Sequence, residues 1–319
     1  MNFLLIITLA LGPALFWMWW YYRKDVYDKE PMRLLALVFI LATPLSVLCG
    51  ILEYTIDGNG QAQFSQNSGL FWATVFYFGV VGVIEELAKF FVVITLVYRR
   101  KEFNEQMDGI IYATAAALGF ATLENVFYIL DEGAFIILLR GPVSTLGHIL
   151  FSAMWGAALG LSRFELNKNR RWQIIARGLL LAILTHGAFD VLISLGKFFP
   201  EQSWLSLLVL PFLALLYYMV SRQIAHALNV SSFNPGNVLQ HLKEGHSRQL
   251  EPRSDNPVPP APRYAPNPNA YQFRNGQAIN PVKVKAETQP CPDCGRDNLL
   301  DRANNDKAEC YNCGTELNK

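Results

Sequence analysis

The sequence predicts an all-α membrane protein: a polytopic bundle of about seven transmembrane helices, followed by a polar tail. Apolar residues make up 52% of the 319 residues and charged residues only 17%. The apolar residues gather in runs of about 20, the length of helix that crosses the hydrocarbon core of a bilayer. The net charge of +1, with no basic stripe outside the loops, argues against a nucleic-acid partner.

Seven apolar runs predict the spans, so the lipid bilayer is an expected partner. They cover residues 3–22, 34–54, 70–98, 109–130, 142–164, 173–195 and 204–226. The first run lacks a basic N-terminal region and ends in an aromatic belt at 17–22, which is typical of a retained anchor. The apolar piece 134–140 is too short to span, and we expect a surface or re-entrant helix there.

Basic residues fall on alternate loops, which predicts the orientation of the chain. By the positive-inside rule these loops face the cytoplasm. We therefore expect a multi-pass integral protein, in the plasma membrane if the cell is bacterial, with its N-terminus outside and its tail in the cytoplasm. The basic loop residues are Arg23, Lys24, Lys29 and Arg33, then Arg99, Arg100 and Lys101, then Arg163, Lys168, Arg170 and Arg171.

The tail that follows the membrane bundle of residues 1–228 has two predicted parts. Residues 229–288 are rich in Pro, Asn, Arg and Ser, which predicts a disordered linker. In residues 289–316, two C-x-x-C pairs, each followed by Gly and separated by fifteen residues, indicate a zinc ribbon. The alternative of two disulfides is disfavoured in a reducing compartment. The four cysteines are Cys291, Cys294, Cys310 and Cys313.

Four thiolates leave no open position on a tetrahedral zinc ion, so the ribbon zinc is expected to be structural. The module would then serve to bind a protein partner rather than to catalyse a reaction.

The third run contains three charged residues, Glu85, Glu86 and Lys89. Each charge costs about 2.5 to 3.5 kcal/mol at the centre of a membrane helix, so an ionisable cluster there is a candidate functional site. Lys89 lies four residues after Glu85 and three after Glu86, so an internal ion pair on one helical face is the alternative. One lysine neutralises only one of the two carboxylates.

Three later runs also carry polar residues at membrane depth: Glu124 and Asn125, then His148, then His186 and Asp190. At about 1.5 Å rise per residue, the acids and imidazoles of all four runs lie on the order of 18 to 24 Å from the predicted cytoplasmic side. We therefore expect them to form one layer. Taken singly, each has another interpretation, as a helix contact, a satisfied core imidazole or a carboxylate that orients a ring.

These residues carry a resemblance to the PrsW family of intramembrane proteases, relatives of the CAAX prenyl endopeptidases. The motif E-E-x-x-K falls on the charged residues of the third run. F-x-x-x-E falls on Phe120 and Glu124, a lone motif histidine on His148, and H-x-x-x-D on His186 and Asp190. The resemblance covers the membrane region to about residue 226. It implies an endopeptidase that cleaves membrane-tethered proteins, in some members an anti-sigma factor.

The resemblance to the CAAX enzymes is looser, because Asp190 stands where those enzymes have an asparagine. An ionised aspartate cannot donate a hydrogen bond to an oxyanion. Asp190 is therefore expected to be protonated, or to act as an orienting group or as a ligand. A catalytic zinc ion is a second hypothesis, with Glu124, His148 and His186 as its candidate ligands.

The resulting hypothesis is a protease in which Glu85 or Glu86, together with Glu124, activates a water molecule. The histidines and the Asn125 amide would stabilise the oxyanion, and Lys89 would hold the second carboxylate ionised. Two alternatives stay open at this point. Relays of Asp, Glu and His also serve proton- or ion-coupled transporters, and the polar layer of a non-enzymatic scaffold could merely join helices while the ribbon recruits a partner.

Overall fold

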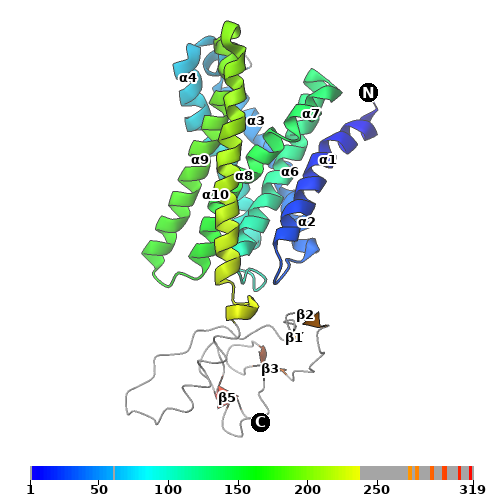
Figure 1. Ribbon diagram of the computed structural model, residues 1–319. Coiled ribbons are helices and arrows are strands. Elements are labelled where there is room, and N and C mark those ends of the chain that lie inside the picture. Colours follow the sequence, from blue (N-terminus) through cyan, green and yellow to red (C-terminus); the bar gives the residue numbers. More distant parts are fainter. Residues whose placement is uncertain are drawn as a thin grey trace. The chain divides into compact units, whose positions relative to one another are not determined.

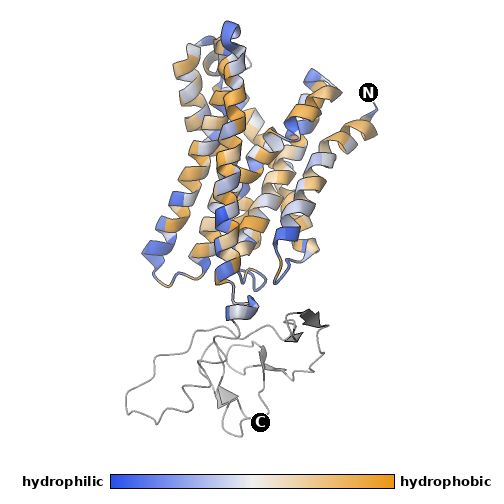
Figure 2. Ribbon diagram, viewed as in Figure 1, coloured by the Kyte–Doolittle hydropathy of each residue, from blue (hydrophilic) through white to orange (hydrophobic). Residues whose placement is uncertain are grey.

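The computed structural model describes residues 2–59 and 62–237, together with six short strands of the tail. The chain divides into two compact units, Met1–Ser231 and Ser232–Lys319. The first unit is a bundle of α-helices, as predicted (Figure 1). Figure 2 shows apolar residues along the middle of the bundle and hydrophilic residues at its ends.

Ten α-helices make up the described part of the bundle. They are α1 (Phe3–Lys24), α2 (Met32–Ala42), α3 (Leu45–Ile56), α4 (Gly69–Phe76), α5 (Gly82–Leu96), α6 (Gln106–Glu132), α7 (Ile137–Arg140), α8 (Ser144–Arg163), α9 (Lys168–Phe198) and α10 (Val209–Val230). Short 3-10 segments, Ala134–Ile136 and Pro200–Leu208, precede α7 and α10, and π-helical turns cover Gln63–Asn67 and Tyr77–Val81.

Six helical segments in the described residues are long and apolar enough to cross a membrane. They correspond to six of the seven predicted spans. The remaining predicted span, 70–98, is α4 and α5 joined by the π-helical turn Tyr77–Val81, without a break in the helix. Such turns interrupt the regular helical ladder and are frequent at functional sites. The piece 134–140 is the short 3-10 segment and α7, with Phe135 and Leu138 exposed.

The centre of the bundle is α6, which packs against α8 over most of its length. Gly109 on α6 faces Gly156 on α8, and Gly160 faces the backbone of Gln106. A Cβ atom at any of these three glycines would collide with the opposite backbone. Small residues of this kind let membrane helices approach closely, so the sequence itself sets the α6–α8 distance.

A second glycine contact joins the start of α5 to α9. A Cβ on Gly82 would lie 2.8 Å from the carbonyl oxygen of Ile183, and one on Gly187 would lie 2.8 Å from Cα of Phe78. The turn of α5 that carries Glu85 and Glu86 is therefore held directly against the turn of α9 that carries His186.

The three basic loops lie at one end of the bundle. Asn104 Nδ2 donates to Asp28 Oδ2 at 3.0 Å, and Arg163 Nε donates to the carbonyl oxygen of Phe103 at 3.3 Å. Arg33 also forms an ion pair with Glu102, at 4.0 Å. The loops after α1, α5 and α8 therefore meet, as their alternation along the chain predicts.

In the second unit the described residues form three antiparallel strand pairs. They are β1 (Gln272–Arg274) with β2 (Gln277–Ile279), β3 (Thr288–Pro290) with β4 (Asp297–Leu299), and β5 (Ala308–Glu309) with β6 (Glu316–Leu317). Most of the predicted linker and the cysteines Cys291, Cys294, Cys310 and Cys313 lie outside the described residues.

Three buried carboxyl groups lie in the loops at the end of the bundle where the basic loops meet. Glu30 accepts a hydrogen bond from the Tyr112 hydroxyl, Asp25 accepts one from the Glu30 amide, and Glu105 accepts one from Ser231 Oγ. Burial raises the pKa of Glu30 to about 8, that of Glu105 to about 7 and that of Asp25 to about 6. The folded protein therefore holds protons that the unfolded chain would release.

The stability of the bundle should consequently fall as the pH rises. A carboxyl group whose pKa is raised by folding stabilises the native state fully below its unfolded pKa and loses this contribution as the pH passes its folded pKa. The melting temperature in detergent should decrease from pH 5.5 to 8.5, and Glu30→Gln should flatten this decrease. The exposed Asp131→Asn variant should keep the wild-type slope, and an unchanged slope in Glu30→Gln would refute the assignment.

Candidate active site

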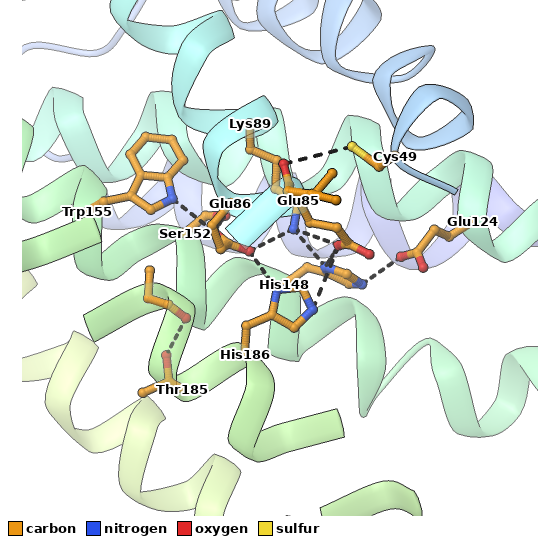
Figure 3. A network of polar contacts seen from close by, with 12 residues as sticks. Cys49, Glu85, Glu86, Lys89, Glu124, His148, Ser152, Trp155, Thr185 and His186 are labelled. Carbon is orange, nitrogen blue, oxygen red and sulfur yellow. Dashed lines mark hydrogen bonds and ion pairs between the residues drawn. The ribbon is translucent and has the colours of Figure 1, made fainter. Parts of the chain in front are cut away.

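Four helices bring the predicted polar residues together (Figure 3). Helix α5 supplies Glu85, Glu86 and Lys89, α6 supplies Glu124, α8 supplies His148, and α9 supplies His186 and Asp190. Each of these side chains lies within ion-pair or hydrogen-bond distance of at least one other. The single layer predicted from helix depth is therefore present.

Lys89 lies at the centre of the cluster and is fully buried. Its ammonium nitrogen is 2.7 Å from Glu86 Oε1, 3.2 Å from Glu85 Oε2 and 3.1 Å from His148 Nδ1, and it also lies over the ring of Phe120. An ammonium group only donates, so Nδ1 of His148 must accept. The neutral ring then carries its proton on Nε2, which faces Glu124 Oε2 at 2.7 Å.

Glu86 is fully buried, and four donors surround its carboxylate. Lys89 Nζ and His186 Nδ1 approach Oε1 at 2.7 and 3.0 Å. Ser152 Oγ and Trp155 Nε1 both donate to Oε2 at 2.9 Å. A carboxylate with two donors on each oxygen is held ionised and has no lone pair left for another group.

Glu85 has a different environment, although it is the adjacent residue. Its Oε2 accepts from Lys89 and faces His148 Nδ1 at 3.8 Å and His186 Nε2 at 3.7 Å. Glu85 also lines a cavity in which Glu86 takes no part. The two adjacent carboxylates therefore have different environments: Glu86 is enclosed by hydrogen-bond donors, and Glu85 lines the cavity.

Each imidazole is oriented by a carboxylate on its far side. His148 Nε2 contacts Glu124, and His186 Nδ1 contacts Glu86. An ionised carboxylate only accepts, so in a neutral ring the proton would lie on the nitrogen beside that carboxylate, and the nitrogen that faces Glu85 would carry none. His186 Nε2 also lies 3.7 Å from Asp190 Oδ2.

Asn125 is buried beside the cluster, and its amide group forms hydrogen bonds to Thr145 and Arg140. Its Nδ2 donates to Thr145 Oγ1 at 3.1 Å, and its Oδ1 accepts from Arg140 Nε at 3.0 Å. Arg140 in turn lies 3.7 Å from Glu124 Oε2 and over the ring of Tyr128. The amide thus positions a guanidinium group, which differs from the oxyanion contact expected from the sequence.

Glu85, His148 and His186 form a donor set that fits a metal ion. One ligand atom from each lies within 4.8 Å of the other two, and all three residues are buried. Two imidazoles and a carboxylate are the protein ligands of several catalytic zinc sites, and a ligand histidine normally has its other nitrogen on a carboxylate. An ion there would require Lys89 to release His148 Nδ1, because that nitrogen has one lone pair.

The donor set differs from the predicted one by a single residue. Glu124 was expected as the carboxylate ligand. It contacts Nε2 of His148, however, whereas Nδ1 of the same ring faces Glu85. Among the described residues, this is the only group of at least three His, Cys, Asp or Glu residues with suitable spacing.

A cavity of about 330 Å³ opens beside the cluster. The residues of the cluster that line it are Glu85, Glu124, His148, His186 and Asp190. It continues past Glu53 and Tyr77 to Asp57 and Ser65, beyond the end of α3. A second cavity of about 700 Å³ lies between α3 and α6 and is also lined by Glu85 and Glu124. The reacting groups are therefore reachable from two directions.

Four residues that support the cluster or line its cavity were not predicted from the sequence. Ser152 and Trp155 follow His148 by four and seven positions, a helical spacing that places all three on one face of α8. Glu53 is an acidic residue inside the predicted span 34–54, so it could have been identified as a candidate functional residue by the same argument as Glu85. Arg140 gave only a weak signal, as a single cation at the end of the short apolar piece 134–140.

Comparison with known proteins agrees with this site. The family profile described as "PrsW family intramembrane metalloprotease" matches residues 30–219. Protease PrsW of Clostridioides difficile (strain 630) is 32% identical over 216 residues, which are 66% of this chain and 87% of that protein. Protease PrsW of Bacillus subtilis (strain 168) is 28% identical, over 71% of this chain and 97% of that protein.

Protease PrsW of Geobacillus kaustophilus (strain HTA426) is 30% identical, over 59% of this chain and 79% of that protein. No solved structure matches the chain. The family match includes all four helices of the polar cluster and ends before the cysteine pairs. The chain is therefore a multi-pass intramembrane endopeptidase and belongs to the PrsW family.

Proposed function

We propose that Glu85 is the carboxylate at the reacting centre of this protease and that Glu86 holds the centre in place. The observation that carries the proposal is the contrast between the two residues. Glu86 is enclosed by four donors, whereas Glu85 faces the cavity and one ring nitrogen of each histidine. Of these two carboxylates, only Glu85 can therefore contact a water molecule or a peptide bond in the cavity.

The residues that would hold a catalytic metal are Glu85, His148 and His186. A divalent ion such as Zn²⁺ supplies Lewis-acid polarisation of water and of the substrate carbonyl. Neutral rings with their protons on the carboxylate side would support ligation, because an imidazole nitrogen that carries no proton cannot donate to an oxyanion. We therefore propose that the histidines act as ligands, in place of the oxyanion role expected from the sequence.

Other residues of the cluster have roles in handling protons and charge. Asp190 Oδ2 is buried, forms no hydrogen bond within the described residues and belongs to a side chain that lines the cavity. It is placed to take a proton from the attacking water and to return it to the leaving amine. Glu124 orients His148, and Arg140 is the cation in the cavity wall that can face developing negative charge.

The substrate is a membrane protein, and we propose that it is a tethered regulator of the anti-sigma-factor type. The resemblance of the motifs supports this assignment. A peptide bond in a helix cannot enter the site until its backbone groups leave their helical partners. The two cavities beside Glu85 supply the polar space that an unwound segment requires.

We also propose that the chain lies with its N-terminus outside and its tail in the cytoplasm. The meeting of the three basic loops at one end of the bundle supports this orientation. In the tail, we propose a zinc ribbon at Cys291, Cys294, Cys310 and Cys313 that binds a protein partner. Strand β3 ends directly before Cys291 along the chain, and β5 ends directly before Cys310.

Amide substitutions should distinguish the two adjacent carboxylates. Glu85→Gln should reduce cleavage of a single-span model substrate in detergent at least ~100-fold, with little change in melting temperature. Glu86→Gln should lower both, because breaking a buried charge network costs about 3 to 5 kcal/mol. Ser152→Ala, which removes one donor to Glu86, should retain activity with a modest loss of stability. Cleavage by Glu85→Gln within twofold of wild type would refute the proposal.

Metal content should follow the same donor set. In the full chain with its four tail cysteines changed to serine, mass spectrometry of the purified protein should find about one divalent ion per molecule, as expected for one closed set of ligands. His148→Ala and His186→Ala should lose this ion, whereas Ser152→Ala should retain it. A protein that is free of metal and fully active after chelation would show that the carboxylates act without an ion.

A further inference from the structure

Glu53 is a carboxyl group of the cavity wall that the proposed mechanism does not use. It lies one turn before the end of α3 and lines both cavities of the site. Its Oε1 is buried and has no hydrogen-bond partner, and no ion pair to Glu53 is present in the described part of the chain. A carboxyl group with a buried, unpaired oxygen is stabilised by any cation that reaches it.

The charges that line the smaller cavity do not balance. Five carboxyl groups and one arginine face it, besides the two histidines. Arg140 already contacts Glu124. Lys89 contacts Glu85 but does not line the cavity. The carboxyl groups in this wall are Glu53, Asp57, Glu85, Glu124 and Asp190.

Asp57 has an internal structural role. It accepts hydrogen bonds from the backbone amides of Phe64 and Ser65 and from the Ser65 hydroxyl, and so holds the π-helical turn Gln63–Asn67. Glu53, Glu124 and Asp190 each have a buried oxygen without a hydrogen bond. Glu124 lies beside His148 and Arg140, and Asp190 lies beside His186, so among the described residues only Glu53 has no such neighbour.

Glu53 also lies where the two cavities meet. Residues that line both include Gly50, Tyr54 and Tyr128, together with Glu53 itself. Helix α3 buries only Ser46 and Cys49, and its remaining side chains, such as Ile51 and Leu52, are half-buried or exposed. The larger cavity thus reaches the apolar outer side of the bundle. Glu53 and Glu85 both line this cavity, so a segment that lies between α3 and α6 would be beside both carboxyl groups.

We propose that Glu53 makes this protease selective for substrates that carry a lysine or arginine side chain close to the scissile bond. This inference rests on the proposed function of the Glu85 site. The basic side chain of the substrate would supply the missing partner, and the attraction is stronger than in bulk water because the protein walls of the cavity have a lower dielectric constant. An acidic side chain at the same position would be repelled by the surrounding carboxylates.

The test measures selectivity with the full chain in detergent. Single-span model substrates share one sequence, with the cleaved bond mapped by mass spectrometry, and carry Lys, Gln or Glu at each position near the cut in turn. At one of these positions, wild-type kcat/KM should be about tenfold higher for Lys than for Gln and lower again for Glu.

The variants separate selectivity from catalysis. Glu53→Gln should bring the Lys to Gln ratio to about one while it cleaves the Gln substrate within about twofold of wild type. Glu53→Lys should prefer the Glu substrate. The control Glu132→Gln removes an exposed carboxylate at the end of α6 and should keep the wild-type ratio.

Two results would overturn the inference. Equal rates for the Lys and Gln substrates at every position in wild type would show that no selectivity exists. The same Lys preference in wild type and in Glu53→Gln would show that it arises elsewhere. In both cases the Gln substrate is still cleaved, so the proposed function stands, whereas failure to cleave any substrate would overturn the proposed function as well.

Discussion

The buried ammonium group of Lys89 is the interaction on which the bundle and its site both depend. An uncompensated charge at this depth would be costly, and Lys89 is compensated by two carboxylates of its own helix and by an imidazole of α8. Glu86 extends the same network to His186 on α9 and to Trp155 on α8. Three helices are thus joined through one cation, so the packing of the bundle cannot be separated from the arrangement of the reacting groups.

Two adjacent glutamates have different roles because of helical geometry. Successive side chains on a helix point about 100° apart, so when Glu86 points into the contact with α8 and α9, Glu85 must point toward the cavity. Gly82 packs against Ile183 and Gly187 packs against Phe78, so the backbones of α5 and α9 are in close contact next to Glu85 and Glu86.

Helix depth could be predicted from the sequence, whereas helix rotation could not. A rise of about 1.5 Å per residue is nearly constant, so the meeting of Glu124, His148 and His186 with the third span followed from counting residues. Which atoms face each other depends on the rotation of every helix and on the π-helical turn before Gly82, and neither leaves a signal in the hydrophobic pattern. For this reason the carboxylate that joins the histidines is Glu85 rather than Glu124, and Asn125 faces Arg140. Ser152 and Trp155 could have been predicted from the sequence, because their helical spacing places them on the same face of α8 as His148.

The two cavities meet at Glu53, which suggests the shape of a small-molecule inhibitor. One cavity is polar and ends at the reacting groups, and the other is bounded by apolar residues of α3 and α6, such as Ile51 and Phe127. A molecule with an amine head and a flexible apolar tail would match both halves, with the head beside Glu53 and the tail between the helices. Compounds of this shape would block the site without any group that binds a metal.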